Sequence, residues 1–572
     1  SGLERDYITQ WSYGIGETWT LLIPNTKGGA SMPLSLNETA MAKANNDYIS
    51  IYQQIGQYWG EQPMTAGPVY VGAFVLMLFV LGLFIVKGPM KWALLAVTIL
   101  SVLLSWGRNF MPFTDFFLDY IPMYAKFRTV ASILVIAEFT IPLLAMLALK
   151  KLMDEPELLR TKAKWLYTSF ALTGGFCLLF ALMPQFFFPS YISSSEMQAL
   201  SQIPAEELAP LVQNLTEMRV AVFTADCWRS FWIIVIGLAG LLLYRYGKVK
   251  AEWLVAGLTV LCLVDMWQVN KRYLHDSMFV EPQGVARIQK TEADNYILEK
   301  SGTGRDYRVL NFTVSTFNDN NTSAFYSSVG GYHAAKLRRY QELIEAHIAP
   351  EMSKVYEALR SAPMDTVAMM QGQSPYPVYH LEAATTDSLF PVINMLNTRW
   401  FILGAGEKGE VKLPIENNTA FGNAWFVTGI KWADNANEEL EALGTEDLRH
   451  TAVVAKADFG FLKAGGEGTV QLTSYGANEA KYEVESSQGG LVVFSEVYYS
   501  GWTATIDGQP AEVGRANYVL RALNVPAGKH EVIFTFDPQS VHTTETVAYI
   551  ALAVLVLLIA AAIVLSLKKK KG

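Results

Sequence analysis

The sequence contains few of the residues that most soluble enzymes use for chemistry. Of 572 residues, three are cysteine and seven are histidine, and no metal-ligand spacing is found among them. Cys177 and Cys262 lie inside apolar runs and Cys227 lies at the edge of another, so no disulfide framework is expected. The phosphate-binding G-x-x-x-x-G-K loop, the G-x-S-x-G elbow and the zinc motif H-E-x-x-H are absent. The sequence therefore does not indicate the soluble enzyme classes that these motifs mark.

Charged residues are also scarce, at 17% of the chain, whereas 51% of the residues are apolar. The net charge is −8, and no basic stripe is interleaved with aromatic residues in the way that nucleic-acid binding requires. These values predict a membrane protein without a nucleic-acid partner.

Seven long apolar runs predict a polytopic α-helical protein. A membrane-spanning helix needs roughly 20 residues, and the second and sixth runs are at or below that limit. A final basic tail, 568–572, follows the last run. The runs are 66–86, 92–106, 130–149, 164–183, 228–244, 252–267 and 547–567.

Basic residues predict the orientation, because cytoplasmic loops are enriched in Lys and Arg. If every run spans once, the four basic segments fall on one side, which is then cytoplasmic and includes the C-terminus. Residues 1–65 are then outside, although no signal peptide precedes them. We therefore expect the C-terminal part of a longer membrane protein, with a block of spans before residue 1. The basic segments are Lys87 with Lys91, residues 150–164, residues 245–250, and Lys568 to Lys571.

The predicted domains follow from this topology. An outer segment, 1–65, precedes a six-span bundle, 66–267, with outer loops 107–129 and 185–227. A large α+β domain on the outer side begins with a mixed α/β region, 268–475, and ends in a β-sandwich, 476–545, because short alternating runs there are separated by turn residues. The last transmembrane helix, 547–567, and the basic cytoplasmic tail follow. Within the mixed region we expect a strand over 308–314 and a helix over 334–348.

The outer loop 107–129 is expected to form a short interfacial helix. Its aromatic residues fall on one face at helical spacing, opposite Asp115 and Asp119. Pro112 suits the first turn and Pro122 ends the helix. Loop 185–227 predicts one or two amphipathic helices, with Ser193 and Glu196 in a capping box.

Two carboxylates stand inside apolar runs, where an ionised group is costly and usually faces a partner or a cavity. For Glu138 a contact between helices and a functional role are both open. Asp265 lies near the outer end of its run and is expected to pair with Lys271 or Arg272.

Two groups of residues suit glycan binding. His333, Arg338 and Arg339 lie beside Lys336 and form either an anion clamp or a solvated basic helix face. Trp11 lies among carboxylates and other aromatic residues, which suits either carbohydrate binding or the aromatic belt at a membrane interface.

Six segments are distinctive in combination. They are SGLERDYITQWSYGIGETWTLLIPN, QYWGEQPMTAGPVYVGA, GRNFMPFTDFFLDYIPMYAKFRT, FNDNNTSAFYSSVGGYHAAKLRRYQELIE, NMLNTRWFI and FSEVYYSGWTATIDGQPAEVGRANYVLRALNVPAGKHEV. Together they resemble the YfhO family of bacterial membrane proteins. This resemblance implies a GT-C type glycosyltransferase of the bacterial inner membrane that moves a sugar from a polyprenyl-phosphate carrier to a cell-envelope glycan on the outer face.

Placement assigns roles within such an enzyme. Arg108, Lys126 and Arg128 would hold the lipid phosphate, and Asp115 or Glu17 would orient the acceptor or a divalent ion. His333, Arg338, Arg339 and Trp11 would bind the acceptor. In GT-C folds the main catalytic Asp lies in the first outer loop, which we expect upstream of Ser1, so this stretch alone is expected to be inactive.

The sequence indicates no cofactor beyond the polyprenyl-phosphate sugar donor, and the metal requirement stays open. Two alternatives to an enzyme remain. The chain could be a non-enzymatic transporter or export partner for lipid-linked glycans, or a membrane-anchored protein whose sandwich binds glycans.

Overall fold

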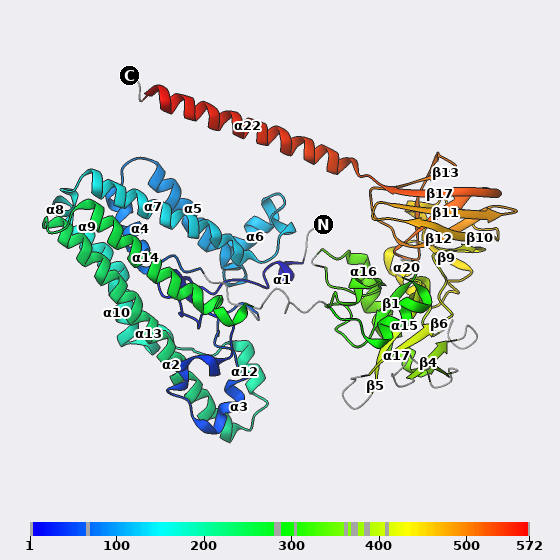
Figure 1. Cartoon of the computed structure of the whole chain (residues 1–572), viewed down its shortest axis with the longest axis horizontal. Coiled ribbons are helices and arrows are strands. Elements are labelled where there is room, and N and C mark those ends of the chain that lie inside the picture. The colour runs from blue at the N-terminus through cyan, green and yellow to red at the C-terminus, as the bar shows by residue number, and fades with distance from the viewer. Residues whose placement is uncertain are drawn as a thin grey trace. The chain divides into compact units, whose positions relative to one another are not determined.

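The computed structural model describes residues 4–63, 69–279, 288–302, 306–333, 335–359, 364–367, 376–381, 389–405 and 411–569. The chain forms two compact units, Ser1–Pro282 and Gln283–Gly572. In Figure 1 the first unit, coloured blue to green, is helical, and the second contains the β-sheets and ends in the red helix α22.

Each of the seven apolar runs contains a helix. Pro142 lies inside the third of these helices, and a π-helical turn, Ala171–Gly175, divides the fourth run into two helices. In the first unit the polar outer segment adds only short helices. The helices of the apolar runs are α4 (Ala73–Ile85), α5 (Met90–Ser105), α7 (Val135–Asp154), α9 (Ala163–Phe170), α10 (Phe176–Leu182), α13 (Ala205–Arg245), α14 (Ala251–Tyr273) and α22 (Gln539–Lys569). The short ones are α1 (Arg5–Ile8), α2 (Glu38–Met41), α3 (Ile49–Tyr52), α8 (Leu158–Thr161), α11 (Pro184–Phe187) and α12 (Ser194–Leu200).

Within the described ranges, five helical segments are long and apolar enough to cross a membrane. A sixth candidate combines α5 with the segment Gly107–Tyr120, and the two parts are bent by 109°. Helix α4 has only 13 residues, fewer than a typical span needs. Residues 66–68 of its expected run lie outside the described residues.

Helix α13 differs from the expected arrangement of separate outer helices followed by a span. It is one helix of 41 residues, about 60 Å long, whereas the hydrocarbon core of a bilayer is roughly 30 Å thick. No Gly or Pro occurs between Leu211 and Ile236, so nothing ends the helix where its composition changes. Its first half buries Leu211, Leu215 and Met218 against residues of the outer segment, and α2, α3 and α12 gather there (Figure 1).

The predicted capping box at α12 is half correct. The Ser193 side chain accepts a hydrogen bond from the Glu196 amide at 3.2 Å. The Glu196 carboxylate, however, binds both terminal nitrogens of Arg219 at 2.7 Å, because a buried guanidinium attracts a carboxylate more strongly than a backbone amide does.

Helix α6 (Met111–Tyr120) confirms the predicted helix in loop 107–129. Pro112 lies in its first turn, and the helix ends before Pro122. Its aromatic side chains contact one another along one side, with ring centroids 5.3 Å apart for Phe116 and Tyr120. Asp115 and Asp119 both pair with Arg5 of α1.

The prediction for Asp265 is wrong. Its buried carboxylate accepts hydrogen bonds from the Tyr70 hydroxyl at 2.8 Å and from Arg229 at 2.7 Å. Lys271 pairs with Asp276, and Arg272 pairs with Asp226. Asp265 therefore faces α13 and the start of α4, a direction that sequence neighbours do not reveal.

The second unit begins with a mixed six-stranded sheet in the order β2-β1-β5-β6-β4-β3. The expected strand 308–314 ends at Asn311, because the Asn311 side chain bonds the amide and hydroxyl of Thr313 and turns the chain. The strands are β1 (Arg308–Asn311), β2 (Ser327–Ser328), β3 (Met364–Val367), β4 (Tyr376–Leu381), β5 (Thr398–Ala405) and β6 (Val411–Asn417).

The expected helix 334–348 starts later and extends further than predicted. Helix α16 (Arg338–Leu343) continues through a π-helical turn, Ile344–Ile348, into α17 (Ala349–Leu359). Leu343 and Ile344 are buried. The other helices of this unit are α15 (Glu292–Ser301), α19 (Pro391–Met395), α20 (Ala436–Ala442) and α21 (Lys456–Phe459).

Two further sheets form the C-terminal β-sandwich, in the orders β10-β11-β17-β13-β14 and β15-β16-β12-β7. Between them, Tyr482 and Phe534 pack edge-on against Phe494, with centroids 4.9 and 4.8 Å away. Strands β7 and β10 come from before residue 476, the expected start. The strands are β7 (Ala424–Val427), β10 (Thr469–Tyr475), β11 (Glu479–Ser486), β12 (Gly490–Val497), β13 (Trp502–Ile506), β14 (Gln509–Ala511), β15 (Gly514–Ala516), β16 (Leu520–Val525) and β17 (Gly528–Phe536). A parallel pair, β8 (Gly429–Ala433) and β9 (Thr451–Ala455), forms a separate two-stranded sheet.

Buried Glu351 on α17 makes the second unit sensitive to pH. Its carboxylate accepts hydrogen bonds from the amides of Val392 and Ile393 at 3.2 and 2.9 Å. Burial nevertheless raises the pKa of Glu351 from 4.5 to about 7. Because the folded state binds this proton more tightly than the unfolded chain does, stability is lost as the pH rises from about 4.5 through about 7.

We expect Glu351→Gln to stabilise the unit at pH 8, by less than the roughly 3 kcal/mol that the pKa shift allows. Gln carries no charge, but its NH2 group cannot accept from one of the two backbone amides that bind the carboxylate. Hydrogen exchange of the peptide containing α19, compared with wild type at pH 5 and pH 8, measures this effect. The exposed Glu357→Gln on the same helix is the control. Equal exchange in wild type and Glu351→Gln at pH 8 would contradict the prediction.

Candidate functional site

A cavity of about 550 Å³ lies in the helical unit between the outer segment and α10. We name it the Glu17 cavity. One part of its lining is polar and the other is aromatic. The polar residues are Glu17, Lys27, Glu61, Asn109 and Ser190, and the aromatic ones are Trp19, Phe176, Phe180, Phe187 and Phe188.

Glu17 lies in the 3-10 helix Gly16–Leu21 and is 1% exposed. Its carboxylate accepts hydrogen bonds from the Tyr58 hydroxyl at 2.8 Å and from the Glu61 amide. Burial raises the pKa of Glu17, although these two donors favour its ionised form. Gly14 leaves room for it, since a Cβ there would lie 2.9 Å from a Glu17 carboxylate oxygen.

Lys27 supplies a cation to the same cavity. It is half-buried, and its Nζ lies 3.5 Å from the Ser190 carbonyl oxygen. Burial lowers the pKa of Lys27, whereas the nearby carboxylates of Glu17 and Glu61 raise it. The next residue, Gly28, has φ +93°, and a Cβ there would lie 2.1 Å from the Gln57 carbonyl oxygen. This position of the loop therefore requires glycine.

Arg108 reaches the edge of this cavity through Glu61. Its Nη2 donates to the Glu61 carbonyl oxygen at 2.8 Å and lies 3.9 Å from the Glu61 carboxylate. The neighbouring Asn109 donates to the Tyr13 carbonyl at 3.0 Å. One of the three predicted phosphate-binding residues thus contacts Glu61, a lining residue of the Glu17 cavity.

The other two residues of that trio have different neighbours. Arg128 donates to the Tyr7 hydroxyl and lies over the rings of Tyr7 and Trp11, 5.5 and 5.9 Å from their centroids. Lys126 lines a hollow of about 280 Å³ at the end of α6. Asp115, bound to Arg5, is 40% exposed. The structure therefore separates these residues from Glu17.

The acceptor candidates of the second unit lie around α16. Arg339 stacks on the Tyr518 ring at 4.5 Å and pairs at 3.0 Å with Glu439, which is buried. Arg338 pairs with Glu342 at 2.9 Å within the helix. His333 is exposed and its Nδ1 accepts the Ala335 amide. Arg339 thus contributes to the fold through a buried carboxylate.

Several residues of the Glu17 cavity have no clear signal in the sequence. Tyr58 and Glu61 are more than 40 positions from Glu17, and only the fold brings them together. The run Phe186-Phe187-Phe188 after an apolar helix was a usable signal for the aromatic wall. In the residues that the structure describes, no three His, Cys, Asp or Glu side chains are close enough to hold a metal ion.

Comparison with known families bears on the C-terminal part of the chain. Residues 462–547 match the family model described as bacterial membrane protein YfhO. This YfhO match spans β10 to β17 of the sandwich and the start of α22, and it confirms the resemblance seen in the sequence. Together with the long apolar helices, the YfhO match supports a membrane location. No curated protein and no solved structure matches the chain.

Proposed function

We propose that the chain acts in a bacterial membrane as a GT-C type glycosyltransferase, which moves a sugar from a polyprenyl phosphate to a cell-envelope glycan. The Glu17 cavity carries this proposal, because it joins an aromatic wall to a buried carboxylate and a cation. A lipid-linked sugar has a complementary group for each: an apolar chain for the aromatic wall, a phosphate for the cation and a hydroxylated ring for the carboxylate.

Each part of the cavity has a role in this reaction. The four phenylalanines contact the isoprene units next to the phosphate. Lys27 and Arg108 neutralise the phosphate. Glu17 takes the proton of the acceptor hydroxyl while that oxygen attacks the anomeric carbon, and the bond between this carbon and the phosphate oxygen breaks. The lipid phosphate leaves, and the phosphate ester supplies the driving force without a nucleotide.

The proposed topology places the cavity at the outer surface of the inner membrane. The basic segments then face the cytoplasm, as does the C-terminus. The outer segment and the first half of α13 lie outside, which suits a carrier whose phosphate lies at headgroup depth.

A transfer assay tests the proposal through Lys27. Membranes from cells expressing the full-length protein are given polyprenyl phosphates that carry labelled glucose, galactose, mannose or N-acetylglucosamine. We expect Lys27→Gln to lower transfer at least tenfold, mainly through a higher KM for the donor, because it loses a half-buried partner of the phosphate.

Lys43→Gln is the matched control, because Lys43 is exposed in the same outer segment. If Lys27→Gln transfers sugar as well as wild type does, Lys27 does not bind the lipid phosphate. If labelled lipid moves across the membrane and no sugar is transferred, the proposal of an enzyme is wrong and the protein is a transporter.

A further inference from the structure

A second cavity of about 400 Å³ shares a loop with the Glu17 cavity. Lys27 lines the Glu17 cavity, and Asn25, two residues earlier, lines the second one. We name it the Asn25 cavity. Its other residues come from the outer segment, α13 and the end of α14. Its volume lies within the range of small-molecule sites, roughly 300–1,000 Å³.

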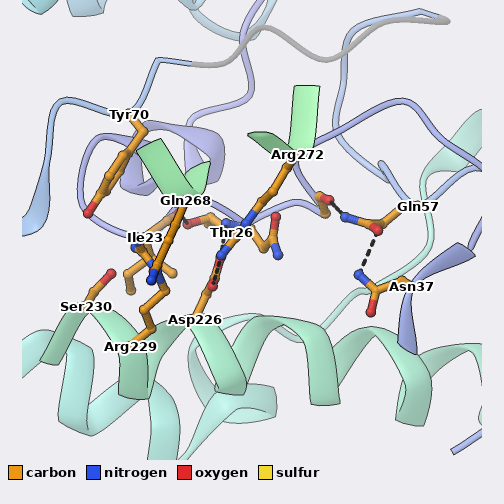
Figure 2. Close-up of polar contacts among 12 residues, drawn as sticks. Ile23, Thr26, Asn37, Gln57, Tyr70, Asp226, Arg229, Ser230, Gln268 and Arg272 are labelled. Atoms are coloured by element: carbon orange, nitrogen blue, oxygen red, sulfur yellow. Dashed lines mark hydrogen bonds and ion pairs between the residues drawn. The ribbon is translucent and has the colours of Figure 1, made fainter. Parts of the chain in front are cut away.

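An ion pair forms one side of the Asn25 cavity. Arg272 binds both oxygens of Asp226, at 2.5 and 2.8 Å. The backbone N–H of Asn25 donates to the same carboxylate at 3.0 Å. Figure 2 shows Arg272 extending from α14 to Asp226 on α13, with Asn37 and Gln57 to one side of the pair. The Asp226 charge is therefore compensated, and this carboxylate does not favour a metal ion.

Side-chain amides form another side. Asn37 donates to the Gln57 side-chain oxygen at 2.7 Å, and Gln57 donates to the Gly28 carbonyl. Asn25 is 6% exposed, yet its side-chain oxygen has no hydrogen-bond partner in the described part of the chain. An unpaired buried acceptor is unfavourable, so this oxygen is suited to receive a donor from a ligand.

The charges of the lining balance. Glu38 and Asp226 are opposed by Lys271 and Arg272, and Lys271 also pairs with Asp276. A neutral lining does not select a phosphate or another anion. It suits an uncharged molecule whose hydroxyl groups donate to Asn25 and whose C–H surfaces contact apolar residues such as Leu36.

We infer that the Asn25 cavity binds one or two units of a neutral saccharide. This assignment goes beyond the proposed transfer reaction, because it concerns binding at a separate site and does not require Glu17 chemistry. If the transfer reaction also holds, the shared loop connects a glycan held at Asn25 with the donor held at Lys27.

Protection from labelling tests this inference. Thr39 lines the cavity and is exposed, so Thr39→Cys can be labelled with a maleimide. The native cysteines are buried or half-buried. The chain in detergent is labelled with maltose, N,N′-diacetylchitobiose or inorganic phosphate present. We expect at least one sugar to slow labelling fivefold or more, saturably, and phosphate to have no effect.

Three comparisons make the result decisive. Adding Asn25→Ala should weaken protection at least tenfold in sugar concentration, whereas Glu17→Gln should leave it unchanged. Ser201→Cys, which is exposed on a different segment, should show no protection. The inference is overturned if neither sugar protects Thr39→Cys, if phosphate protects equally, or if Asn25→Ala changes nothing. Thr39→Cys without a second substitution reports on the native cavity. Its protection by sugar therefore decides the inference even if Asn25→Ala does not fold.

Discussion

Replacing Glu17 with Gln is expected to reduce sugar transfer by about 10²–10³-fold, with little change in the KM for the lipid donor. Proton removal by a positioned carboxylate contributes typically 10²–10⁴-fold. Gln keeps the shape of Glu. Its oxygen can accept from the Glu61 amide while its NH2 group donates to the Tyr58 hydroxyl oxygen, so the fold is retained while the base is lost. The measurement is initial transfer rate against donor concentration in membranes containing the full-length protein.

The pH dependence of the wild-type rate carries the same prediction. Glu17 acts as a base only when ionised, and burial raises its pKa. Activity should therefore fall, as the pH decreases, at a higher pH than for an ordinary carboxylate. In Glu17→Gln the residual activity should not show this fall at acidic pH, which we call the acid limb.

The control is Glu207→Gln, because Glu207 is exposed in the first turn of α13. A loss of tenfold or less, with the acid limb retained, would contradict the role of Glu17 as the base. That result would assign proton removal to another residue, with Glu17 only orienting the acceptor sugar.

The sequence predicted those elements whose signals are local. Helix α6 follows from aromatic spacing between two prolines, and the sandwich strands follow from alternation between turn residues. Tyr482 illustrates this, since its alternating neighbours place it inside the sandwich, where it meets Phe494. The seven apolar runs are local signals as well, and each of them contains a helix.

The sequence did not predict features that depend on segments far apart in the chain. Glu17 receives hydrogen bonds from Tyr58 and Glu61, and no periodicity connects them. Asp265 is near Lys271 and Arg272 in sequence, yet it binds Arg229 on another helix. For α13, the change from amphipathic to apolar composition predicts a boundary. The helix nevertheless continues there, because no Gly or Pro occurs between Leu211 and Ile236.

Replacing Glu196 with Ala is expected to destabilise the helical unit by about 3–5 kcal/mol, because it leaves a buried charge without its partner. Arg219 is fully buried, and Glu196 binds both of its terminal nitrogens at 2.7 Å. The same guanidinium donates to the carbonyls of Tyr191 and Gly56, each at 2.8 Å, and so links α13 to two outer segments. These segments lead to Ser190 and Glu61 of the Glu17 cavity.

Thermal or urea unfolding of the purified chain, followed by tryptophan fluorescence, measures this loss. Glu217→Ala is the control on α13, because Glu217 is exposed, and it should change stability by less than about 0.5 kcal/mol. The double variant Glu196→Ala with Arg219→Met removes both charges, so it should be more stable than Glu196→Ala alone. If the double variant is the less stable of the two, the unpaired charge is not the cause, and the loss arises from the carbonyl contacts that Arg219 makes to both outer segments.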